Sequence, residues 1–130
     1  MRKALIVIGI IVAVSVVISA GILLRLSVMA NRMEAAVEGM EPVVLDTLED
    51  GTYSGSFGDF LVRATVEVTV SDGRIEEVEV VEQDSGPGYE ALQTTERIEA
   101  AQSPRVEAVS GATSSSHSIM VAAYRALTAR

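Results

Sequence analysis

Val106–Ser116 has the sequence VEAVSGATSSS, in which a short apolar run leads into seven small or hydroxylated residues that open a helix. Apolar side chains recur at helical spacing after this stretch, at Ile119, Met120, Ala123, Tyr124 and Leu127. Gly111 and Ala112 leave room for a bulky partner beside the backbone. The backbone N–H groups in the first turn of a helix can bind an anion, and Thr113 places a hydroxyl group beside them. The stretch therefore predicts a phosphate-sized anion pocket with a nucleophile-capable side chain.

The same string also has an ordinary explanation as a capped loop that leads into a helix. Serine and threonine are common N-cap residues, and glycine is common in turns. Caps far outnumber anion sites, so spacing alone favours the capped loop. Further landmarks are needed to decide between the two interpretations.

Ser110–Thr113 resembles the flavinylation motif of the FMN-binding domain family, which includes flavoprotein subunits of sodium-pumping quinone reductases and related electron-transfer complexes. Two other landmarks occur in the family's order. Asp50–Tyr53 resembles the opening strand, and Pro87–Tyr89 resembles the Pro-Gly turn in the middle of the domain. The resemblance covers residues 50–127, and three landmarks in order make it specific.

The resemblance implies that FMN is covalently attached to Thr113 through a phosphoester. Ser110, Gly111 and Ala112 would form the recognition loop, with Ser114 beside the acceptor. Glu107 stands six positions before Thr113, where the family usually has Asp; the exchange keeps the charge and lengthens the side chain.

The resemblance also names a partner and a second contact with the flavin. In relatives a separate FAD:protein FMN transferase uses FAD and Mg²⁺ to make the link. The loop that contains Pro87 and Gly88 lies near the flavin ring in the family. This chain has Ser85-Gly86 where relatives usually carry Glu-Thr, so contacts from this loop are expected to be reduced.

The residues before the motif predict a small antiparallel sheet. Three strands are expected, at Thr52–Phe57, Phe60–Val70 and Ile75–Gln83. The middle strand alternates valine with polar residues, so one face is buried and one is wet. Ser71–Arg74 reads as a hairpin turn, and Ile75 is out of phase with the inward Val78 and Val80, which suggests a bulge.

A helix is expected at Tyr89–Ala101, with Leu92 and Ile98 toward the core. Together with the final helix this gives an α+β domain at residues 50–130, a small antiparallel sheet with helices packed on one face.

An N-terminal transmembrane helix is expected to precede the domain. Ala4–Leu24 contains 21 residues without a charge, which is enough to span the hydrocarbon. A cleaved signal peptide is the competing interpretation, but its apolar region is usually only about 7–15 residues long. We therefore expect an anchor at residues 1–26 and a tether at residues 27–49. The short basic tail and the position of the family's flavin domains favour a single pass through the cell membrane, with the N-terminus in the cytoplasm and the domain outside.

Composition limits the remaining functions. The 130-residue chain has no cysteine and a net charge of −8, with 18 acidic and 6 basic residues after Arg32, so it is a poor nucleic-acid binder. No spacing suggests a catalytic triad or a metal site, and His117 reads as a solvent-facing residue rather than a flavin contact. The leading prediction is a membrane-anchored electron carrier with covalent FMN and unknown redox partners, rather than a stand-alone enzyme. A non-covalent flavin-binding or sensing module and a cofactor-free docking domain are the alternatives.

Overall fold

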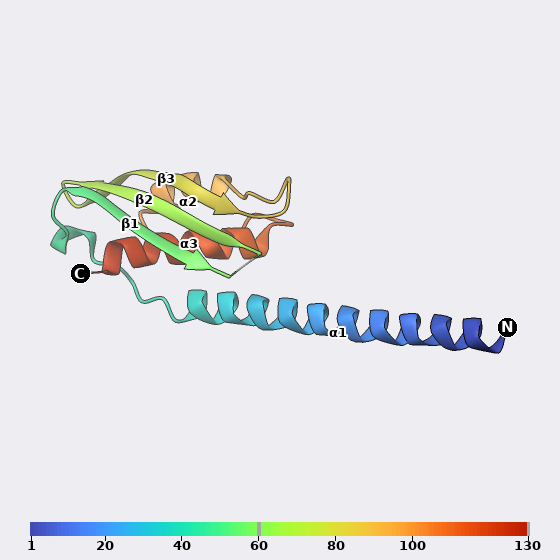
Figure 1. Cartoon of the computed structure of the whole chain (residues 1–130). Helices are drawn as coiled ribbons and strands as arrows, with labels where there is room; N and C mark the ends of the chain where they lie inside the picture. The colour runs from blue at the N-terminus through green and yellow to red at the C-terminus, as the bar shows by residue number, and fades with distance from the viewer. Residues whose placement is uncertain (60, 130) are drawn as a thin grey trace. The chain divides into compact units, whose positions relative to one another are not determined.

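The computed structural model describes residues 1–59 and 61–129, and it divides into two compact units, Met1–Arg32 and Met33–Arg130. Figure 1 shows the elements in chain order: α1 (Arg2–Glu38), the short 3-10 helix η1 (Leu45–Thr47), β1 (Gly51–Gly58), β2 (Arg63–Ser71), β3 (Arg74–Asp84), α2 (Gln93–Ala101) and α3 (Thr113–Thr128). The fold is α+β, with one antiparallel sheet and helices, as the sequence predicted.

Helix α1 is long and apolar enough to cross a membrane. It has 37 residues, whereas a span needs about 20, and the most apolar window of the helix is not buried by protein. An exposed surface of isoleucine and valine suits hydrocarbon better than water. The first unit therefore contains a candidate membrane span.

The sheet has the order β1-β2-β3, and both pairs are antiparallel. Strand β2 is central, and its valines alternate with polar residues so that the inward side chains are fully buried: Ala64, Val66, Val68 and Val70. The strand begins at Arg63, three residues later than expected; Phe60, where the sequence placed its start, lies outside the described residues.

Glycine and two bulges shape the β2–β3 hairpin. Asp72 and Gly73 have φ of 50° and 71°, the left-handed pair that a tight hairpin turn needs. Thr69 pairs with Glu77 and Val70 with Ile75, so Glu76 is an extra residue; this is the bulge that the phase of Ile75 predicted. A second bulge at Val81, between the Thr65–Glu82 and Val66–Val80 pairs, was not expected.

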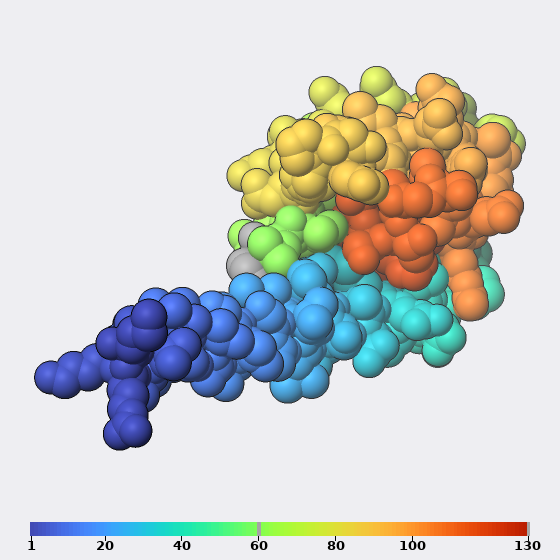
Figure 2. All heavy atoms as spheres, turned by 90° about the vertical axis from the view of Figure 1, so that its right-hand side faces the viewer, coloured from blue at the N-terminus to red at the C-terminus, as the bar shows by residue number. Residues whose placement is uncertain are grey.

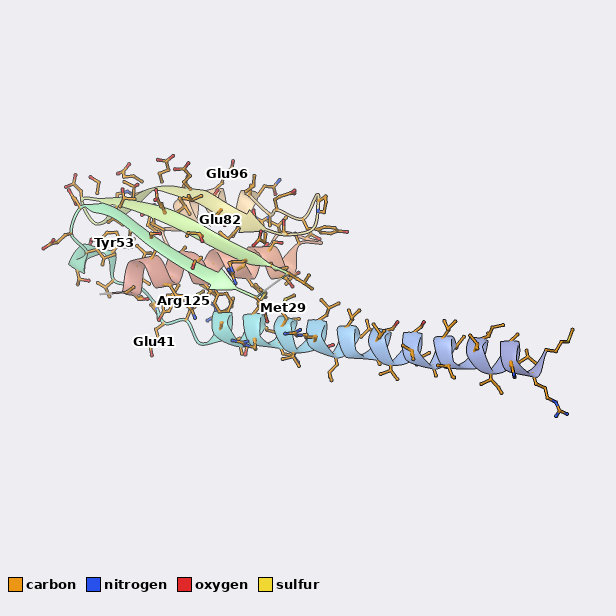
Figure 3. All side chains as sticks on the ribbon, in the orientation of Figure 1. Met29, Glu41, Tyr53, Glu82, Glu96 and Arg125 are labelled. Carbon is orange, nitrogen blue, oxygen red and sulfur yellow. The ribbon has the colours of Figure 1, made fainter. Side chains whose placement is uncertain are left out.

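Helix α3 forms the centre of the domain. Its inner side packs on the sheet through Ile119, Ala123 and Leu127, which are all at most 2% exposed. Strand β1 approaches α3 closely at Gly55, where an added Cβ would meet the backbone of Ala122 and Ala126. Arg125, labelled in Figure 3, donates to Ser56 O at 3.2 Å and lies over the Phe57 ring.

The chain between α1 and the sheet also contributes to the domain. Val37 and Met40 are buried against Met120 and Val121 of α3, on a different side from the sheet. Val43, Leu45 and Leu48 pack at the margin of the main core. Much of the segment expected to be a tether therefore lies within the second compact unit.

Helix α2 starts later than the sequence predicted. The expected start at Tyr89 was wrong, because Ala91 has a left-handed φ of 55° that interrupts helical geometry and places the first helical residue at Gln93. Leu92 is consequently outside the core and 56% exposed, whereas Ile98 is fully buried as expected. Side chains of α2 and of its C-cap residue bond to β3: Glu99 Oε1 accepts from Val78 N at 2.8 Å, and Gln102, the C-cap, bonds to both Ile75 N and Ile75 O.

Candidate functional site

A tight turn holds the Ser-Gly-Ala stretch before α3. Ala112 N donates to Val109 O at 3.0 Å, which closes a four-residue turn with Ser110 and Gly111 at its centre. Gly111 has φ of 80°, a conformation that costs a residue with a side chain about 1–2 kcal/mol. Apart from Gly111 itself and its two chain neighbours, no atom of the described residues lies within 4 Å of where a Cβ would stand at Gly111, so the backbone is open to a ligand there.

Helix α3 begins at Thr113, and its N-cap is Ala112, which makes no side-chain cap. The motif is thus a loop that leads into a helix, but neither Ser110 nor Thr113 caps that helix with its side chain. The first helical bond runs from Ser116 N to Ala112 O at 3.0 Å, and the amides of residues 113–115 precede it. Such amides have no carbonyl one turn back and can bind an anion. The Thr113 side chain is exposed beside them.

Ser116 fastens the motif loop to the helix. Its fully buried hydroxyl accepts a hydrogen bond from Val109 N at 2.9 Å and donates to Ala112 O at 2.8 Å. Both ends of the turn are thereby tied to one side chain. Ser115 is also buried, at 3% exposure, so the last part of the serine string is structural and only its beginning faces solvent.

A second tight turn, Gly86–Tyr89, follows β3. Tyr89 N donates to Gly86 O at 3.0 Å, Pro87 occupies the second position, and Gly88 has φ of 82° at the third. This is the arrangement of a type II turn, which explains the Pro-Gly pair. Glu90 stabilises the turn, since its carboxylate accepts from Gly88 N at 3.1 Å.

The two turns face each other across two neighbouring cavities. One, of about 420 Å³, lies between the motif and the start of α2, and it is lined by residues 88–93 and 109–112. The other, of about 400 Å³, lies in front of α3 and is lined by Val62, Gly86, Tyr89, Gly111, Ala112, Thr113, Ser114 and Ser115. In Figure 2 the loop after β3, in yellow, and the motif, in orange, lie on the same face of the domain. Each cavity is within the usual size range of small-molecule sites.

Most of the residues expected at the site line these cavities: Ser110, Gly111, Ala112, Thr113, Ser114 and Gly88. Pro87 and Glu107 do not. Pro87 is exposed on the outer side of its turn, and the Glu107 side chain is exposed outside both cavities. The structure thus separates the hydroxyl of Thr113, which faces a cavity, from the carboxylate of Glu107, which faces solvent.

Sequence reasoning missed three contributors to the site. Tyr89 lines both cavities and is 56% exposed, so its ring forms a wall that the Pro-Gly pattern alone did not indicate. Ser116 holds the loop through its hydroxyl, a role that the serine string did not indicate. Arg97 on α2 donates from Nη1 to the carbonyl oxygens of Glu107 and Ala108, at 2.8 and 3.0 Å, and no sequence signal marks it.

His117 is half-buried and does not line either cavity. Burial lowers the pKa of its imidazole below 6.5, and the negative charge of Glu34 partly opposes that shift. The sequence predicted a solvent-facing side chain, whereas His117 is partly buried. Among residues 1–59 and 61–129, no three His, Asp or Glu side chains are grouped to hold a metal ion.

Comparison with known proteins gives one match. The family model of the FMN-binding domain matches residues 62–128, which extend from just before β2 to the end of α3 and include both turns and both cavities. Strand β1 precedes the matched region. No curated protein and no solved structure matches the chain.

Proposed function

The chain belongs to the FMN-binding domain family, and from that premise we propose that it is a membrane-anchored electron carrier whose FMN is attached to Thr113 through a phosphoester. One observation carries this proposal. The exposed hydroxyl of Thr113 lies at the amide end of α3, in a cavity shared with the Pro-Gly turn.

The residues of the site fit an FMN group. The amides at the start of α3 suit a phosphate, and the open side of Gly111 admits a bulky substituent. Tyr89 offers an aromatic wall for a flat ring, since stacked rings are favourable at separations of about 4.5–7 Å between centroids. Ser116, which lines neither cavity, holds both ends of the Val109–Ala112 turn and so keeps the start of α3 in place.

The attachment requires a separate enzyme. In the proposal, Thr113 Oγ1 forms a bond to the phosphorus of the FMN half of FAD, AMP leaves, and the hydroxyl proton passes to a base of the FAD:protein FMN transferase. Two features of this chain serve that reaction. The hydroxyl is exposed, and the amides of the first helical turn stabilise negative charge on the phosphate oxygens.

When bound, the flavin would supply one- or two-electron transfer, chemistry that the side chains of the domain lack. Attachment through the phosphate leaves the ring free of covalent change, so the domain holds and orients it. The redox partners are expected to be other components of an electron-transfer system. A covalent link suits a domain outside the cytoplasm, where a released cofactor would be diluted and lost.

The absorbance spectrum and acid stability of the flavin test this proposal directly. The full chain, produced together with an FAD:protein FMN transferase, is expected to show flavin absorbance that stays with the protein pellet after acid precipitation. Flavin in the supernatant would indicate non-covalent binding. A colourless protein would indicate a docking domain without cofactor.

We further propose that α1 anchors the chain with its N-terminus in the cytoplasm and the domain from Asp50 onward outside. Arg2 and Lys3 precede the apolar run, and the positive-inside rule places such a tail in the cytoplasm. Protease added to intact cells, or to spheroplasts where an outer membrane is present, is expected to digest the domain while a cytoplasmic control protein survives. A protected domain, or a mature N-terminus near Asn31, would contradict the proposal.

Glu107 is expected to serve recognition by the transferase, because its carboxylate is exposed outside both cavities. Glu107→Ala should lower the rate of flavin incorporation, whereas Glu107→Asp should preserve or raise it. Neither substitution should change the visible spectrum of protein that is already loaded. The measurement is intact-protein mass against time with purified transferase, FAD and Mg²⁺. Equal rates for wild type and Glu107→Ala would show that Glu107 is only a surface acid.

A further inference from the structure

Arg97 makes an unusual contact with the chain that leads to the motif. A single guanidinium nitrogen, Nη1, donates to the carbonyl oxygens of two consecutive residues, Glu107 at 2.8 Å and Ala108 at 3.0 Å. In a regular extended strand, consecutive carbonyls point in opposite directions. Both carbonyls reach one nitrogen, so the backbone here departs from that alternation, and the two N–H groups of Nη1 hold this arrangement. Hydrogen bonds from a charged donor are stronger than neutral ones.

This contact joins the two walls of the larger cavity. One wall is the segment Gly88–Gln93, which continues directly into α2. The other is Val109–Ala112, which follows Ala108 directly. Arg97 lies one turn into α2 and bonds to the residues just before the second wall. Arg97 therefore contributes to the separation of the walls and to the direction in which the chain enters the motif turn.

Ser116 fixes the other end of the same loop. Its hydroxyl bonds to Val109 and Ala112, whereas Arg97 bonds to Glu107 and Ala108. Side chains from two helices thus hold the backbone of four residues before the acceptor: Glu107, Ala108, Val109 and Ala112. The side chain of Glu107 is left exposed, since only its backbone is engaged.

We propose that Arg97 is a positioning residue for flavinylation: it holds the acceptor loop so that Thr113 and Glu107 are presented together to the transferase, and it then keeps the cavity walls at the spacing the attached flavin occupies. This inference rests on the proposed function. Arginine suits the role because it stays charged at any physiological pH and its planar fork has a fixed geometry. Lysine carries the charge but not the fork, so it should replace arginine only in part.

The test uses the full chain in detergent, with purified transferase, FAD and Mg²⁺. Flavinylation rates are measured by intact-protein mass over a range of protein concentrations for wild type, Arg97→Lys, Arg97→Ala and Arg105→Ala. Arg105 is a matched control, because it is an exposed arginine in the loop between α2 and α3 and its loss changes the net charge by the same amount. We expect kcat to fall by roughly 10- to 100-fold in Arg97→Ala, as small misplacements of a reacting group produce. Arg97→Lys should be intermediate, and Arg105→Ala should match wild type.

A second measurement reports on the loaded protein. Flavin fluorescence anisotropy should fall and visible circular dichroism should weaken in Arg97→Ala that has been driven to full loading, because the cavity walls are no longer tied together. Thermal unfolding identifies the temperature at which all variants are folded, and rates are compared there. Equal kcat for wild type and Arg97→Ala, or an equal loss in Arg105→Ala, would overturn the positioning role. If wild type itself gains no mass, the proposed function fails instead, so the two failures are distinct.

Discussion

Thr113→Val is expected to abolish covalent flavin attachment. Valine has nearly the shape of threonine but lacks the oxygen that would bond to phosphorus, so no substrate for the transferase remains. Thr113 is exposed in the first turn of α3, and surface substitutions of this kind usually change stability by less than about 0.5 kcal/mol. The mass of wild type should rise by that of FMN less one water after co-expression with the transferase. The mass of Thr113→Val should not change.

The structure reduces the number of hydroxyl groups that could compete with Thr113 as the acceptor. Ser115 and Ser116 are at most 3% exposed, which leaves Ser110 and Ser114 as the hydroxyls that a second enzyme could reach. Ser114→Ala and Ser110→Ala are therefore the matched controls, and both should still gain the full mass. If Thr113→Val carries the added mass, the acceptor is misassigned. If wild type never gains it, the electron-carrier proposal loses its main support.

Gly55→Ala is expected to destabilise the domain strongly. A Cβ at this position would collide with backbone atoms of Ala122 and Ala126, which cannot rotate away as a side chain could. Overpacking of this kind costs about 1–3 kcal/mol, and we expect the upper end because backbone must move. In a domain of about 100 residues such a loss lowers Tm by roughly 10 °C or more.

Ser54→Ala provides the comparison for this prediction. Ser54 is the preceding residue of β1, its side chain is exposed, and it faces away from α3. Its Tm should stay within about 2–3 °C of wild type, because surface substitutions are nearly neutral. Thermal unfolding followed by circular dichroism measures both variants. A Gly55→Ala protein as stable as Ser54→Ala would mean that β1 does not pack closely on α3 in solution.

Much of the fold could be predicted because its signals are local. The alternating valines of β2 and the Asp72-Gly73 turn each determine their own geometry, and the phase of Ile75 was enough to place a bulge. The start of α2 could not be predicted in the same way. Ala91 adopts a left-handed φ that its residue type disfavours, so no local signal in the sequence marks that conformation. Leu92 was misplaced for the same reason.

Some residues of the candidate site could likewise be predicted from the sequence and others could not. The motif and the Pro-Gly turn were recognisable because each needs particular small residues, and the structure brings both to shared cavities. The residues that hold the motif were not recognisable. Arg97 reaches Glu107 and Ala108 from another helix, and nothing in the sequence of α2 indicates which arginine would do so. Ser116 was hidden within a run of identical residues. Tertiary contacts of this kind leave no periodic pattern in the amino-acid sequence.

The bonds from α2 to β3 have a consequence for crowding. Copies of a protein confined to one bilayer diffuse in two dimensions and collide often, and an outermost strand with unpaired backbone groups can then recruit a strand from a neighbour and begin to aggregate. Gln102 and Glu99 already occupy the outward groups of Ile75 and Val78. The bulges at Glu76 and Val81 also break the regular spacing that an incoming strand would require. At these positions, therefore, β3 is a poor template for a strand from a neighbouring copy.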